Sequence, residues 1–262
     1  MNRIEKRMNL LKERKEKAFI TYMTAGLPDI EGTKALIRAQ EEAGVDALDL
    51  GIPFSDPVAD GPVIQDASYK SICLGTNLKK VFLMMEEIRN EGVEIPVAFM
   101  LYYNTILSCG VETFAAACKK AGVDGVIVPD LPMEEQEELL CALERENSAV
   151  LIQTVSLASE GRIPEILKRA RGFVRCVFQT YADGQREMFS AKERECLKAV
   201  KTASNLPVMV DAGIRKPKDA ALVPDLIDGV IEGTYLMQLL KENQYSADAA
   251  KAYCSDFKKM VS

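Results

Sequence analysis

The sequence predicts a single (β/α)8 barrel, a TIM barrel, with an additional helix at its N-terminus. Short apolar runs of strand type alternate with amphipathic helical segments along the chain, which is typical of parallel α/β folds. The 262 residues match the length of about 250 that is common for such barrels. A doubly wound sheet is the alternative, but no G-x-G-x-x-G motif follows the first strand. We therefore expect residues 1–262 to form one barrel domain.

The expected strands are short and mostly continuous apolar runs, as parallel strands buried on both faces require. They cover Ala18–Thr24, Ala47–Gly51, Val97–Tyr102, Gly125–Val128, Ala149–Val155, Phe173–Phe178, Val208–Asp211 and Gly229–Glu232. The expected helices lie near Gly32–Glu42, Leu78–Glu91, Val111–Lys120, Glu134–Glu146, Ile163–Arg171, Ala191–Ala203, Lys218–Val223, Tyr235–Lys241 and Ala247–Met260. In barrels of this class the active site lies where strands end and βα loops begin, so functional residues are expected there.

Local signals mark several helix ends. The segment Ala-Gly-Val-Asp occurs at Ala43–Asp46 and again at Ala121–Asp124, each time between a helix and a strand. Its glycine is expected as the helix C-cap. Ser190 with Glu193 fits a capping box at the start of a helix. The recurrence indicates a repeated αβ unit within one domain.

The N-terminal segment Met1–Lys17 has the pattern of an amphipathic helix. Ile4, Met8 and Leu11 recur at helical spacing among basic and acidic residues. The unbroken apolar core of a signal peptide is missing. We expect this helix to cover one end of the barrel, and a helix lying on a membrane surface is the alternative.

Composition excludes several classes of function. The net charge of -6 argues against nucleic-acid binding, and no apolar run approaches the roughly 18 residues of a membrane span. The seven cysteines are scattered without a C-x-x-C pair, so we expect neither disulfides nor a metal site, but reduced thiols in the cytoplasm. The absence of histidine excludes Ser-His-Asp and Cys-His catalysis. Acid–base chemistry must therefore come from carboxylates, Lys, Tyr or Cys.

The longest segment after a strand, Gly51–Gln65, carries prolines and acids together. Its prolines restrict the backbone, so Asp56 and Asp60 are held in place. Asp49 lies within the preceding strand, and side-chain alternation directs it into the barrel. A carboxylate buried there has a raised proton affinity and suits proton transfer. A structural acid paired with a buried cation is the alternative.

Glycines follow the later strands and indicate a phosphate site. Gly184, Gly213 and Gly233 come after the sixth, seventh and eighth expected strands, and Thr234 opens a helix. Barrels bind phosphate at this position through backbone N–H groups at a helix N-terminus. Each glycine alone would equally suit a turn. Their joint position favours a phosphate ligand.

At this point the sequence resembles the tryptophan synthase α-subunit family. The resemblance is carried by Leu50–Gln65 (LGIPFSDPVADGPVIQ) and by Ala121–Pro132 (AGVDGVIVPDLP). It continues through Tyr22–Gly26, Tyr102-Tyr103-Asn104, Gly213-Ile214 and Asp228–Ile231. The resemblance implies retro-aldol cleavage of indole glycerol phosphate to indole and glyceraldehyde 3-phosphate, without a cofactor in this chain. It also implies a β-subunit partner that receives the indole and carries the pyridoxal phosphate.

The resemblance also assigns roles to residues. Asp60 is implied as the acid/base that contacts the indole N–H, and Asp49 as the group that moves protons between the ring and the glycerol hydroxyl. Implied substrate contacts are Tyr22, Met100, Tyr102, Ile127, Gln153 and Arg175. Implied phosphate contacts are Gly184, Gly213, Gly233 and Thr234, and the β-facing residues are Asp56, Pro57 and Asn104.

Several positions depart from the family pattern. Asp49 stands where the family has a glutamate, which withdraws the carboxylate by one methylene, about 1.5 Å. Arg175 stands where the family has an inward tyrosine, and Asp183 where it has a threonine. Gln153 stands where an apolar residue lines the indole pocket. We expect Arg175 to supply positive charge inside the barrel, either against the carboxylates or for an anionic ligand.

Three hypotheses remain at the level of sequence. The first is a working lyase of the family type, and it is the preferred one because Asp60 and Gly184 are retained. The second is an enzyme that uses the same barrel on a more polar phosphorylated or anionic substrate read by Arg175 and Gln153. The third is a non-catalytic partner of a β subunit. An assay of indole release separates the first from the other two.

Overall fold

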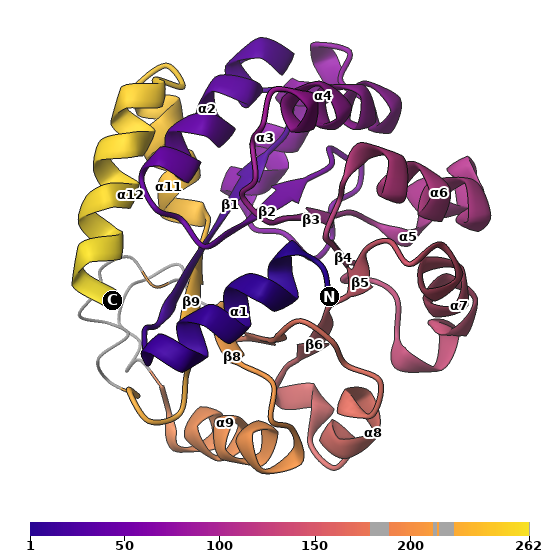
Figure 1. Ribbon diagram of the computed structural model, residues 1–262, viewed down its shortest axis with the longest axis vertical. Coiled ribbons are helices and arrows are strands. Elements are labelled where there is room, and N and C mark those ends of the chain that lie inside the picture. The colour runs from indigo at the N-terminus through magenta and orange to yellow at the C-terminus, as the bar shows by residue number, and fades with distance from the viewer. Residues whose placement is uncertain (179–188, 212–213, 215–222, 262) are drawn as a thin grey trace.

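The computed structural model describes residues 1–178, 189–211, 214 and 223–261. All strand pairings in this part of the chain are parallel and follow the order β5-β4-β3-β2-β1-β9-β8-β7-β6. The strands are β1 (Ala18–Thr24), β2 (Ala47–Gly51), β3 (Val97–Met100), β4 (Gly125–Ile127), β5 (Val150–Leu151), β6 (Gln153–Val155), β7 (Val174–Val177), β8 (Val208–Asp211) and β9 (Gly229–Glu232). Figure 1 shows them as an inner ring surrounded by helices.

The ring closes because β5 and β6 are two halves of one expected strand. They are separated by Ile152, whose N–H still donates to Val126 O at 2.9 Å. β5 pairs with β4 on one side, and β6 pairs with β7 on the other. The predicted eight-stranded barrel is thereby confirmed, with strand bounds that differ from the expected ones by two residues or fewer.

The helices form the outer layer of the barrel (Figure 1). They are α1 (Arg3–Arg14), α2 (Ile30–Glu42), α3 (Pro62–Cys73), α4 (Leu78–Asn90), α5 (Tyr103–Cys109), α6 (Val111–Ala121), α7 (Glu137–Glu146), α8 (Ile163–Leu167), α9 (Ala191–Ala203), α11 (Thr234–Glu242) and α12 (Ala247–Val261), with 3-10 turns η1 (Met133–Glu135) and η2 (Leu157–Ser159). The sequence did not predict α3 or α5, and the expected helix Lys218–Val223 falls, except for Val223, outside the described residues. None of the helices described is long and apolar enough to cross a membrane.

The expected helix signals agree with the structure. Ser190 and Glu193 form a reciprocal capping box at the start of α9. Gly122 is the left-handed C-cap of α6, with φ +66°, and Gly44, with φ +82°, directly follows the C-cap of α2. Both glycines therefore adopt a backbone conformation that disfavours side chains.

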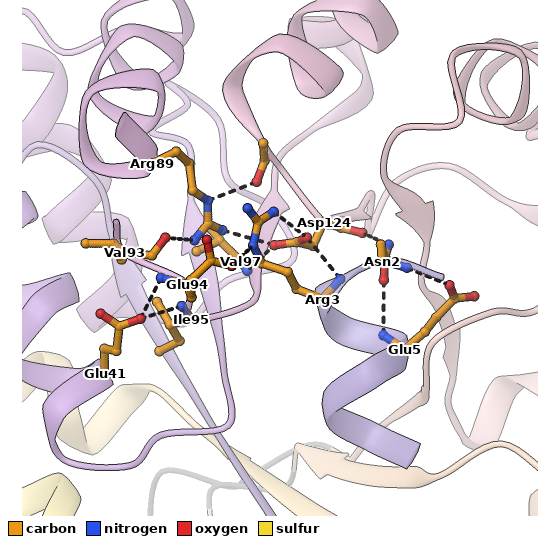
Figure 2. A network of polar contacts seen from close by, with 11 residues as sticks. Asn2, Arg3, Glu5, Glu41, Arg89, Val93, Glu94, Ile95, Val97 and Asp124 are labelled. Atoms are coloured by element: carbon orange, nitrogen blue, oxygen red, sulfur yellow. Dashed lines mark hydrogen bonds and ion pairs between the residues drawn. The ribbon is translucent and has the colours of Figure 1, made fainter. Parts of the chain in front are cut away.

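Helix α1 covers the N-terminal end of the barrel, as the amphipathic pattern predicted (Figure 1). Ile4, Met8 and Leu11 are buried beneath it. Figure 2 shows how its start is fixed: Asn2 Nδ2 donates to the backbone oxygen of Asp124 at 2.6 Å, and Arg3 forms an ion pair with the Asp124 carboxylate. This end of the barrel is therefore plugged and leaves the opposite end for function.

An aspartate ties three of the neighbouring pairs of strands at this end. The carboxylate of Asp46 accepts the backbone N–H of Phe19, and that of Asp124 accepts the N–H of Val97. Asp228 does the same for Val208. Cations neutralise each carboxylate, namely Arg7 and Lys258 at Asp46, Arg3 and Arg89 at Asp124, and Lys201 at Asp228. The aspartate of the repeated Ala-Gly-Val-Asp segment thus joins its strand to the neighbouring one.

Candidate active site

Asp49 lies on the interior face of β2, in the barrel centre. It is a register partner of Tyr22 on β1 and of Ala98 on β3, and it is 0% exposed. Neither of its carboxylate oxygens has a hydrogen-bond partner within the described residues. Burial raises the pKa of Asp49 to about 7, with Arg175 lowering it and Asp211 raising it. A carboxyl group that titrates near neutrality suits general acid–base chemistry.

Asp60 lies above β2, near the end of the loop that leads into α3. Its Oδ2 accepts a hydrogen bond from the Tyr102 hydroxyl at 2.8 Å, and that hydroxyl accepts the Ala59 N–H at 2.9 Å. The Phe54 ring stacks on Tyr102 with centroids 5.0 Å apart. Burial raises the pKa of Asp60, and the hydrogen bond from Tyr102 opposes this. Tyr102 therefore fixes both the loop and the carboxylate.

Tyr22 closes one wall of the interior beside both carboxylates. It is buried on β1, and its hydroxyl lies 3.3 Å from Thr24 Oγ1. A Cβ atom at Gly51 would approach the Tyr22 hydroxyl to 2.1 Å, and one at Gly233 would approach Tyr22 Cβ to 2.7 Å. Glycine at these two strand ends is thus needed to make room for the tyrosine.

Arg175 on β7 reaches into the same interior and forms an ion pair with Asp211 at the end of β8. Its charge lowers the pKa of Tyr22, Asp49 and Asp60. The sequence did not predict this pairing. The other expected partner, Asp183, lies outside the described residues.

The remaining expected substrate contacts divide between two faces of the barrel wall. Met100 and Ile127 are register partners on the interior face, above Ala98 and Gly125. Gln153 pairs in register with Val174, whereas its neighbour Thr154 pairs with Arg175. Because successive residues of a strand face opposite sides, Gln153 is directed away from Arg175. The structure does not bring Gln153 to the interior group.

The Gln153 side chain is nevertheless hydrogen-bonded. Its Nε2 donates to Gln136 Oε1 at 2.8 Å, and Gln136 Nε2 donates to Leu131 O at 3.1 Å. The amide therefore joins β6 to the segment before α7. The chain interruption at Ile152, which the sequence pattern did not reveal, separates the two halves of this wall.

Of the expected phosphate contacts, Gly233 and Thr234 lie within the described residues, at the start of α11. Gly184 and Gly213 lie outside the described residues. Glu232, just before Gly233, pairs in register with Thr21 on the outer face of the barrel. Its carboxylate accepts the N–H groups of Tyr235 and Leu236 at 2.9 and 3.1 Å. Glu232 therefore caps α11, and burial raises its pKa to about 7.

The expected partner-facing residues lie near the surface beside the site. Asp56 is exposed and accepts a hydrogen bond from the Ser55 hydroxyl at 2.6 Å, and Pro57 follows it in the same loop. Asn104 is exposed on α5 and lines a cavity of about 700 Å³ with Phe54 and Leu83 in its wall. This surface is continuous with the loop that carries Asp60.

Chemically, the interior offers two acids for proton transfer, surrounded by apolar and aromatic walls. Asp49 and Asp60 both have a raised pKa, and the buried side chains of Tyr22 and Tyr102 lie beside them. Such an arrangement can add and remove protons from an aromatic ligand without a metal ion or a histidine.

Comparisons with known proteins agree with this arrangement. A family model described as "Tryptophan synthase alpha chain" matches residues 8–262. A curated relative of that name from Lachnospira eligens is 52% identical over 260 residues, which are 99% of this chain and 98% of the relative. A second from Alkaliphilus metalliredigens is 38% identical over 92% of this chain and 90% of its own length.

Solved structures give the same result. Tryptophan synthase subunit alpha from Legionella pneumophila str. Paris matches with a TM-score of 0.88 at 32% identity, covering 100% of this chain and 98% of that one. A chain in a structure of Mycobacterium tuberculosis tryptophan synthase matches with a TM-score of 0.88 at 30% identity, covering 99% and 98%.

Proposed function

The chain belongs to the tryptophan synthase alpha chain family, and we propose that Asp49 and Asp60 carry out its reaction. The chain is a lyase of tryptophan biosynthesis that cleaves indole glycerol phosphate to indole and glyceraldehyde 3-phosphate. Asp60 takes the indole N–H, and Asp49 moves protons between the indole ring and the glycerol hydroxyl. Residues 1–262 act as one barrel domain in this proposal.

The observation that carries these roles is the pairing of Arg175 with Asp211. An unpaired arginine in the barrel would favour an anionic substrate, which was the alternative left open by the sequence. Because Asp211 neutralises Arg175, the interior keeps no free positive charge on this side chain for a second anion. The two raised carboxyl pKa values remain, as proton transfer to and from an indole requires.

The indole ring is assigned to the space between Tyr22, Met100, Tyr102 and Ile127. All four side chains are buried around the two carboxylates. The phosphate is assigned to Gly233 and Thr234, where α11 begins, together with Gly184 and Gly213. This support comes from the position of α11 after the last strand, because helix N-termini bind anions there in barrels.

A β subunit is the proposed partner, docking on the surface that contains Asp56, Pro57 and Asn104. The exposed loop and α5 support this, since both connect directly to Asp60 through Phe54 and Tyr102. The chain itself is proposed to need no cofactor, the pyridoxal phosphate being held by the β subunit. A cytoplasmic location follows from this biosynthetic role, and all seven cysteines are free thiols.

The test is indole release from indole glycerol phosphate by the isolated chain and again with a β subunit added. We expect slow release alone and faster release in the complex. Asp60→Asn should abolish release, whereas Asp225→Asn, which removes an exposed carboxylate at the opposite end of the barrel, should leave it intact. Failure of the intact chain to release indole in both conditions would refute the assignment.

A further inference from the structure

We propose that Arg175 and Asp49 together hold one hydroxyl group of the substrate, with Arg175 Nε–H donating to its oxygen and Asp49 accepting its proton. The inference rests on the proposed function above and adds to it a catalytic contact from β7. In the family pattern this position is a tyrosine, so the contact is particular to chains that carry an arginine here.

The distribution of unpaired atoms points to this pair of residues. Within the described residues, three buried side-chain nitrogen or oxygen atoms lack a hydrogen-bond partner: Asp49 Oδ1, Asp49 Oδ2 and Arg175 Nε. Buried polar atoms are nearly always paired in native proteins, so each exception needs an explanation. That all three belong to two side chains on the interior face of the barrel points to one shared ligand group.

The two side chains face the same interior. Arg175 and Asp49 act on each other electrostatically, and both lie on the interior face of their strands. Arg175 is 7% exposed and Asp49 is 0% exposed, so solvent contributes little to either. Asp211 holds the terminal nitrogen Nη2 of Arg175 and leaves the Nε–H group available.

The chemistry of these atoms selects a neutral hydroxyl. The site offers one N–H donor and two carboxylate acceptors, and a hydroxyl group both accepts and donates. A phosphate or carboxylate would meet the negative charges of Asp49 and Asp211. An ammonium group has no acceptor atom for the Arg175 Nε–H. The glycerol chain of the substrate supplies hydroxyl groups between the indole ring and the phosphate.

The contact contributes directly to bond cleavage. The bond between the protonated ring carbon and the hydroxyl-bearing carbon breaks, and its electron pair returns to the indole ring. The hydroxyl proton passes to Asp49 while the O–H electron pair forms the carbonyl of the aldehyde. Negative charge builds on that oxygen as the proton leaves, and the Arg175 N–H stabilises it at the moment it forms.

The experiment compares two ligands that differ in the glycerol hydroxyls. Indole glycerol phosphate carries two, and indole propanol phosphate lacks both but keeps the ring and the phosphate. For Arg175→Met we expect kcat to fall by roughly 100- to 1000-fold, the range seen when one such donor is removed. The inhibition constant of indole propanol phosphate should stay within about twofold. Arg145→Met on the surface of α7 is the matched control and should change neither.

Two results would overturn the inference. An unchanged kcat would show that Arg175 does not contact the hydroxyl. A fall in kcat that is matched by an equal loss of affinity for indole propanol phosphate would indicate a purely structural role. Because Arg175→Met leaves Asp211 without its partner, Arg175→Met with Asp211→Asn serves as a second variant that keeps the interior neutral. If the unaltered chain releases no indole, the proposed function fails, and calorimetric binding of the two ligands to both proteins still decides the hydroxyl contact.

Discussion

Replacing Asp49 with asparagine exchanges a fully buried titrating carboxyl group for an amide of the same shape. Burial raises the pKa of Asp49 to about 7 from the 3.8 of a free aspartate. The difference is about 3.2 pH units, and each unit corresponds to about 1.4 kcal/mol, so the full effect on the free energy of unfolding is about 4 kcal/mol.

The sign follows from which state holds the proton more tightly. Because the pKa is higher in the folded protein, the unfolded chain releases the Asp49 proton first as the pH rises. Between pH 3.8 and about 7 the folded state therefore loses stability, and above about 7 it carries the whole cost of a buried charge. Asparagine resembles the protonated acid at every pH, so Asp49→Asn lacks this loss.

Urea unfolding at about pH 5 and about pH 9 measures the effect for both proteins. The stability difference should shift in favour of Asp49→Asn by about 2.7 kcal/mol between these values, because about 2 of the 3.2 pH units lie above pH 5. Asp225→Asn, which removes an exposed carboxylate, should give a difference that does not depend on pH in this way. A constant difference for Asp49→Asn would refute the buried titration and, with it, the basis for proton transfer by Asp49.

Three further changes test other parts of the molecule. Asp49→Glu extends the carboxylate by about 1.5 Å towards the substrate and should raise kcat for indole release, and an unchanged kcat would contradict the geometric account. Tyr102→Phe removes the hydrogen bond that lowers the pKa of Asp60, so the acid limb of the pH–rate profile should move to higher pH. An acid limb that does not move would show that Tyr102 does not control the ionisation of Asp60. Arg89→Met removes one of the two cations beside the buried Asp124 carboxylate and should lower the free energy of unfolding, measured in urea, by about 3–5 kcal/mol. A loss below about 1 kcal/mol would show that Arg3 alone neutralises Asp124 well enough.

The strands could be predicted closely because each is a continuous apolar run between a helix cap and a loop. Two helices escaped prediction for different reasons. Helix α3, Pro62–Cys73, has a weak apolar stripe and few buried residues, although Pro62 at its first position was an available signal. Helix α5, Tyr103–Cys109, is too short to show helical periodicity.

The sequence predicted the part of the candidate site that depends on side-chain alternation within a single strand. That alternation placed Asp49 inside the barrel correctly. The family resemblance placed Gln153 in the indole pocket, but the register with β7 puts Thr154, and not Gln153, on the face of Arg175. The pairing of Arg175 with Asp211 depends on the register between two strands, which sequence periodicity does not contain.

That pairing explains how a charged residue could occupy the barrel interior without displacing the proton chemistry. For both Asp49 and Asp60, burial is the largest influence on the pKa, Arg175 lowers the pKa, and Asp211 raises it again. The two charges therefore act on the catalytic carboxyls in opposite directions, and burial still sets the outcome. An arginine alone would favour the ionised form of both acids, and an aspartate alone would add a third carboxylate to the interior. Either residue is thus tolerable at this site because the other is present.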